Sequence, residues 1–99
     1  MGRININSIV SELSLSKNLK WYRKEDYRCI EAYLSSYDIT ICKYSVNGNV
    51  RVSYFIDSSI DGFLEDYADK NKNSHLLHDL ISLYDNGIKT VRPLKKLTL

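Results

Sequence analysis

Residues 38–56 read DITICKYSVNGNVRVSYFI. Two runs rich in β-branched and aromatic residues, 38–46 and 50–56, flank the tripeptide Asn47-Gly48-Asn49. Runs of this composition favour strands, and Asn-Gly tolerates the positive φ angles of a type I′ turn. The stretch therefore predicts a central antiparallel β-hairpin with its turn at Asn47-Gly48.

The register of this hairpin depends on the length of its loop. A two-residue loop sets Tyr44 opposite Arg51, whereas a three-residue loop sets Val46 opposite Val50. Both registers are open from the sequence. The three-residue loop gives the more continuous apolar face, and it is therefore favoured.

Apolar residues at helical spacing predict two helices before the hairpin and two after it. The predicted helices begin after Asn5 or Asn7 (to about Ser14), at about Arg23 (to Ser36), near Ser58 or Ser59 (through Asp69), and after Asn73 or Ser74 (to Asn86-Gly87). Residues 88–91 are compatible with a short C-terminal strand. The 99 residues are thus predicted to form one small α+β domain, 1–99, of order α-α-β-β-α-α, with a frayed basic tail at about 92–99.

The third predicted helix carries a row of acidic residues. Carboxylates recur every four residues, opposite apolar side chains, at Asp57, Asp61, Glu65 and Asp69. On a helix this spacing places all of them on one face. Such a row is a solvated face, a surface for a basic partner, or an imitation of the regularly spaced phosphates of a nucleic acid. A straight row does not converge as metal ligands must, so no metal is expected.

Charge is segregated along the chain although the net charge is only +2. Residues 52–88 hold seven acidic and two basic residues, whereas residues 1–51 and 89–99 are both net basic. A near-neutral total built in this way favours oriented, charge-steered association. The bias towards Ile, Asn, Lys, Tyr and Ser is typical of AT-rich genes, which are common in phages, plasmids and low-GC bacteria, so an origin in a phage or mobile element is expected.

A basic stretch with interleaved aromatic residues spans 17–28. Cations neutralise phosphates and aromatic rings stack on bases, so this stretch is the candidate for nucleic-acid binding. The residues concerned are Lys17, Lys20, Trp21, Arg23, Lys24 and Arg28. With the predicted helix at 23–36 and the hairpin as a wing, they outline a winged-helix-like DNA- or RNA-binding regulator. The alternative is that Trp21 belongs to the core and the charges form a solvated rim.

Catalytic and cofactor motifs are not recognisable in the sequence. His75 and His78 with Asp79 have helical spacing but no third metal ligand. Cys29 and Cys42 lie outside any CxxC or nucleophile motif and are expected to be small, buried, reduced thiols. The expectation is therefore a protein that is not an enzyme and needs no cofactor.

No apolar run approaches the ~20 residues that span a bilayer, so a cytoplasmic protein without membrane contact is expected. Its function is predicted to be non-enzymatic interaction, as an inhibitor or adaptor that docks on a basic protein or nucleoprotein. The acidic row is expected to steer the encounter. Of the eight tyrosines, Tyr22 and Tyr33 are the candidates for surface contacts that supply affinity.

Overall fold

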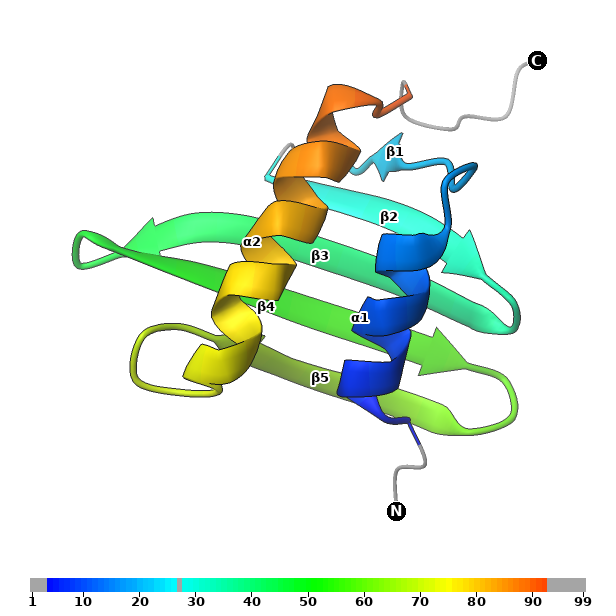
Figure 1. Ribbon diagram of the computed structural model, residues 1–99, viewed down its shortest axis with the longest axis horizontal. Coiled ribbons are helices and arrows are strands. Elements are labelled where there is room, and N and C mark those ends of the chain that lie inside the picture. The colour runs from blue at the N-terminus through cyan, green and yellow to red at the C-terminus, as the bar shows by residue number, and fades with distance from the viewer. Residues whose placement is uncertain (1–3, 27, 93–99) are drawn as a thin grey trace.

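A computed structural model describes residues 4–26 and 28–92. Five antiparallel strands form one sheet, and two helices pack on the same face of it (Figure 1). The elements are α1 (Ile6–Leu15), β1 (Tyr22–Arg23), β2 (Cys29–Leu34), β3 (Tyr37–Val46), β4 (Asn49–Ser58), β5 (Gly62–Ala68) and α2 (Ser74–Lys89). The fold is therefore a compact α+β arrangement of one helical layer on one sheet.

The predicted hairpin at Asn47-Gly48 is confirmed as β3 and β4, but the favoured register is wrong. Val46 pairs with Asn49 and Tyr44 with Arg51, so the loop has two residues. Asn47 and Gly48 have φ angles of 53° and 80°, the pair of positive values that a type I′ turn requires.

Two predicted helices are strands and turns instead, and the order α-α-β-β-α-α is wrong. Residues 23–36 contain the end of β1 and the whole of β2, which pairs with β3. Residues 57–69 complete β4, turn, and return as β5 alongside it. Pairing with the central hairpin gives both segments backbone hydrogen bonds to a neighbouring strand. The stability gained from this pairing outweighs the helical spacing of their apolar residues.

A turn at 59–61 replaces the expected N-terminus of the acidic helix. The Ser58 hydroxyl accepts hydrogen bonds from the backbone N–H groups of Ile60 and Asp61, at 3.2 and 3.1 Å. Gly62 then adopts a φ angle of 83°. Ser58 thus satisfies free N–H groups of a β-turn, which Gly62 allows to close, and not those of a helix N-terminus.

The core lies between the sheet and the helices and follows the two-residue period of the strands. Alternate residues of β2, β3 and β4 are buried against apolar residues of both helices. The sheet contributes Ile30, Ala32, Ile39, Ile41, Val52, Tyr54, Ile56 and Ala68, and the helices contribute Ile9, Val10, Leu13, Leu76, Leu80, Leu83 and Tyr84. On the same face, the Lys43 ammonium lies 2.7 Å from the Asp85 carboxylate and ties β3 to α2.

The first and last predicted helices are confirmed. Asn5 caps α1, and its side-chain oxygen accepts from the Ser8 N–H at 3.2 Å. Asn73 precedes α2 in the left-handed region without a side-chain cap bond. Gly87 does not end α2, which continues to Lys89, so residues 88–91 do not form the C-terminal strand.

Gly87 is explained by packing. A Cβ atom at this position would lie 2.8 Å from Ile30 Cδ1 and 3.1 Å from the ring of Trp21. Glycine in a helix costs up to ~1 kcal/mol relative to alanine, and here it lets α2 approach the sheet. Arg92 is not frayed, because its N–H donates to the Trp21 carbonyl at 2.8 Å; residues 93–99 of the predicted tail lie outside the described part.

Candidate interaction surface on the open face of the sheet

The second face of the sheet is not covered by any described element. The view in Figure 1 shows both helices on the near side of the strands. In the strand half next to the turns at 35–36 and 59–61, the open face combines carboxylates and aromatic rings. This acidic aromatic patch consists of Tyr22, Glu31, Tyr33, Asp38, Phe55, Asp57, Phe63 and Glu65.

Strand pairing places the aromatic residues of the patch in two pairs. The rings of Tyr22 and Tyr33 have centroids 6.2 Å apart, and those of Phe55 and Phe63 are 5.8 Å apart. Phe63 is 63% exposed, Tyr33 50% and Phe55 38%. Exposure of several large rings on one face is unusual for a solvated surface and is typical of contact sites.

The acidic residues of the patch are also neighbours across strands. Asp38 is paired with Asp57, and Tyr33 stands on its other side. Burial of the Asp38 carboxylate and its contact with Glu31 raise the pKa of Asp38 to about 7. Asp38 Oδ1 is buried without a hydrogen-bond partner among the described residues. Lys24 lies 3.5 Å from Glu31 and offsets part of the negative charge.

We expect Asp38→Asn to stabilise the protein above pH 7. Between pH 4 and 7 the unfolded chain loses the Asp38 proton while the folded chain keeps it, so the free energy of unfolding falls as pH rises and stays lower above pH 7. At 1.36 kcal/mol per pKa unit the ceiling is ~4 kcal/mol, and screening of the half-buried Asp38 carboxylate by solvent reduces the expected gain to about 2 kcal/mol.

The measurement is urea unfolding of both proteins at pH 4 and pH 8. The two should coincide at pH 4 and separate at pH 8. Asp79→Asn, which changes an exposed carboxylate on α2, is the control and should leave the pH dependence unchanged. Equal stability of Asp38→Asn and the parent protein at pH 8 would contradict the argument.

The structure brings together four of the six residues predicted to bind a partner. Asp57 and Glu65 lie in the acidic aromatic patch with Tyr22 and Tyr33. Asp61 lies in the turn after β4, where it accepts a hydrogen bond from the Tyr37 hydroxyl at 3.2 Å. This contact raises the pKa of Tyr37. Asp69 lies at the opposite end of β5, beyond the patch.

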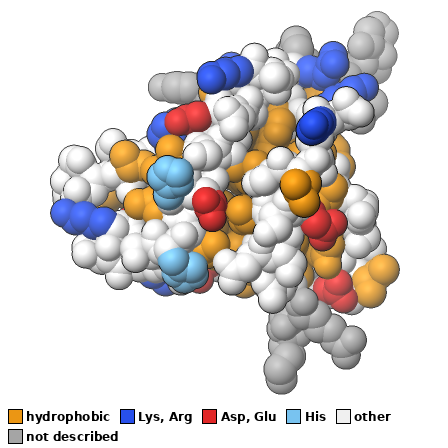
Figure 2. Space-filling view, viewed as in Figure 1, with side chains coloured by type: hydrophobic (Ala, Val, Ile, Leu, Met, Phe, Trp, Pro, Cys, Tyr) orange, Lys and Arg blue, Asp and Glu red, His pale blue; other side chains and the backbone are white. Residues whose placement is uncertain are grey.

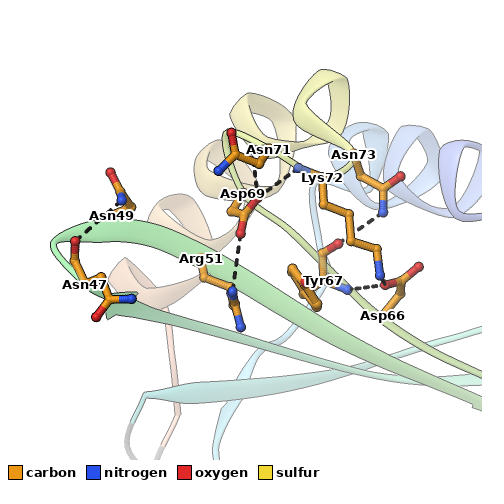
Figure 3. Close-up of polar contacts among 9 residues, drawn as sticks. All are labelled: Asn47, Asn49, Arg51, Asp66, Tyr67, Asp69, Asn71, Lys72 and Asn73. Atoms are coloured by element: carbon orange, nitrogen blue, oxygen red, sulfur yellow. Dashed lines mark hydrogen bonds and ion pairs between the residues drawn. The ribbon is translucent and has the colours of Figure 1, made fainter.

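Asp69 has a structural role in the loop before α2 (Figure 3). Its carboxylate accepts from the backbone N–H groups of Asn71 and Lys72, both at 2.8 Å, and it pairs with Arg51 at 3.3 Å. These contacts lower the pKa of Asp69. The ring of Tyr67 contacts both cations. Its centroid lies 4.1 Å from Arg51 Cζ and 4.4 Å from Lys72 Nζ. Asp69 therefore orders this loop.

The basic residues predicted to bind nucleic acid do not form one surface. Trp21 is 4% exposed and belongs to the core. Lys24 pairs with Glu31, and Arg28 pairs with Asp26 at 2.9 Å. Arg23 lies in β1, where its N–H donates to the Arg92 carbonyl. Lys17 and Lys20 remain exposed in the loop between α1 and β1. With β2 in place of the predicted reading helix, the winged-helix arrangement is wrong.

Cys29 and Cys42 form a disulfide between β2 and β3, which corrects the expectation of reduced thiols. The two residues are directly paired across the strands. Neither sulfur is available as a nucleophile in this form. His75 and His78 are both exposed on the first turns of α2. They lie on the helical side of the sheet, whereas the disulfide joins β2 to β3 on the open face.

Comparison with known proteins gives no relationship, since no family model, no curated protein and no solved structure matches the chain. Neither of the two described helices is long and apolar enough to cross a membrane.

Proposed function

We propose that the protein is a non-enzymatic interaction protein that binds a basic surface of a protein or nucleoprotein through the acidic aromatic patch. The observation that carries the proposal is the shared position of four carboxylates and four aromatic rings on a sheet face that the described elements leave open. This arrangement suits an inhibitor or adaptor, as the charge segregation of the sequence predicts.

Charge and apolar contact have separate roles in this proposal. Asp57 and Glu65 are exposed carboxylates that attract a cationic surface and increase the association rate. Phe63 and Tyr33 are exposed rings that lose contact with water in the complex and supply most of the affinity. Above pH 7, where Asp38 loses its proton, a cation of the partner beside the paired Asp38 and Asp57 reduces their repulsion.

Matched affinity captures from a native lysate test this proposal. We expect Asp57→Lys with Glu65→Lys to abolish capture of a basic protein that the parent protein retains, because both charges then repel it. Asp79→Lys makes the same change of charge on the exposed surface of α2 and should retain the partner. Phe63→Ala should weaken retention while leaving its salt dependence unchanged.

Retention of the same partner by the doubly reversed variant would contradict the proposal. The alternative, a DNA- or RNA-binding regulator that uses segment 17–28, has less support, because Trp21 is buried and two of its cations are already paired.

A further inference from the structure

A cleft lies at the end of the molecule formed by the loop after α1 and the C-terminal half of α2. Its volume is about 680 Å³, which falls within the range of sites for small organic ligands, roughly 300–1,000 Å³. Leu13, Leu19, Trp21 and Leu83 form its apolar wall. Figure 2 shows Lys and Arg side chains gathered at this end of the helical face.

The charged residues that line the cleft are all cationic. Lys17, Lys20 and Arg92 are exposed, and none of the three pairs with a carboxylate among the described residues. No Asp or Glu belongs to the described lining. The side chains of Asn18, Ser82 and Asn86 add neutral hydrogen-bonding groups at the rim.

The C-termini of both helices also lie at this end, and they oppose an anion. Each helix C-terminus is equivalent to about −0.5 charge, so together they cancel roughly one of the three positive charges. A net attraction of about two charges remains. The basic residues therefore exceed what is needed to balance the helix dipoles.

We propose that this cleft binds a nucleoside phosphate. The phosphates would contact Lys17, Lys20 and the planar guanidinium of Arg92, which suits two oxygens of one phosphate. The base or sugar would lie against Leu19 and Leu83. This site is separate from the acidic aromatic patch and does not depend on the function proposed for it.

The chain provides its own probe for this site. Trp21 is the single tryptophan, and it lines the cleft. Inorganic pyrophosphate does not absorb near the tryptophan band, so its binding can be followed by Trp21 fluorescence. ADP and adenosine are followed instead by ¹H–¹⁵N NMR shifts of the cleft residues Leu19, Ser82 and Asn86.

We expect ADP to bind more tightly than pyrophosphate and adenosine to bind most weakly, because only ADP uses both the cations and the apolar wall. Lys17→Gln with Lys20→Gln should weaken ADP binding at least tenfold. Lys70→Gln removes the same kind of charge from an exposed loop outside the cleft and should bind ADP as the parent protein does. Tryptophan emission of the free variants verifies that each is folded.

Three results would overturn the proposal. The first is that millimolar ADP and pyrophosphate move none of the cleft resonances. The second is equal ADP affinity of the doubly substituted variant and the parent protein. The third is binding of an oligonucleotide that ADP does not displace, which would favour the nucleic-acid-binding regulator. None of these results affects the captures that test the acidic aromatic patch.

Discussion

Replacement of Trp21 by alanine should lower the free energy of unfolding by about 3–5 kcal/mol, the range for removal of a buried aromatic side chain. Trp21 is 4% exposed and packs against Gly87 of α2, where an added Cβ atom would lie 3.1 Å from its ring. The surrounding backbone is fixed by hydrogen bonds between Trp21, Arg23 and Arg92. Because the backbone cannot collapse into the space, most of the cavity should persist.

Urea unfolding followed by circular dichroism measures this loss without needing the tryptophan. Leu15→Ala is the control, since Leu15 is a 79% exposed apolar residue at the end of α1. It should change the stability by no more than ~0.5 kcal/mol. A loss below 1 kcal/mol for Trp21→Ala would instead favour the interpretation of Trp21 as a surface residue that stacks on bases.

Reduction of the Cys29–Cys42 disulfide should lower the free energy of unfolding by about 2–3 kcal/mol. The two residues are 13 apart in sequence, and a crosslink over a loop of this length restricts the unfolded chain by about 3 kcal/mol in the chain-entropy description. The loss should not exceed this value, because the short connection between β2 and β3 already brings the strands together.

Denaturation with and without dithiothreitol measures the effect. The variant Cys29→Ser with Cys42→Ser is the control, and the reductant should not change its midpoint. Titration of free thiols verifies that reduction is complete. An unchanged midpoint of the fully reduced parent protein would contradict the prediction.

The terminal helices and the central hairpin could be predicted because local signals agree with tertiary packing there. Asn5 caps α1, and Asn47-Gly48 closes the hairpin. Both effects are local, since they involve no residue that is distant in the sequence. The hairpin register was harder to predict. The three-residue loop was favoured because it gives the more continuous apolar face. The two-residue loop instead places Ile39 and Ile41 in the core and leaves Tyr44 on the open face of the sheet.

The spacing of apolar and acidic residues predicts a helix from Ser58 or Ser59 to Asp69, but the same spacing also fits a strand. Residues four apart share one helical face, but they also share one face of a strand, whose period is two. Gly62 was the signal that separates these cases. Glycine is unfavourable inside a helix, whereas at the start of β5 its φ angle of 83° allows the chain to turn.

The candidate site was therefore only partly predictable. Asp57, Glu65, Tyr22 and Tyr33 were selected as partner-binding residues by charge and residue type, but Glu31, Asp38, Phe55 and Phe63 were missed. Their positions depend on pairing β2 with β3 and β4 with β5. The alternation of Cys29, Glu31 and Tyr33 with buried Ile30 and Ala32 is the pattern that would have revealed a strand there.

The strand order β1-β2-β3-β4-β5 follows the order of synthesis. Each new strand leaving the ribosome finds its neighbour already present, so the sheet has low contact order and should form without long searches. α1 is made before the strands, yet its apolar residues Ile9, Val10 and Leu13 share a core with α2, which is made after them. Until translation reaches α2, the nascent chain carries an incompletely covered sheet, and this interval is when it is most exposed to aggregation and to chaperones.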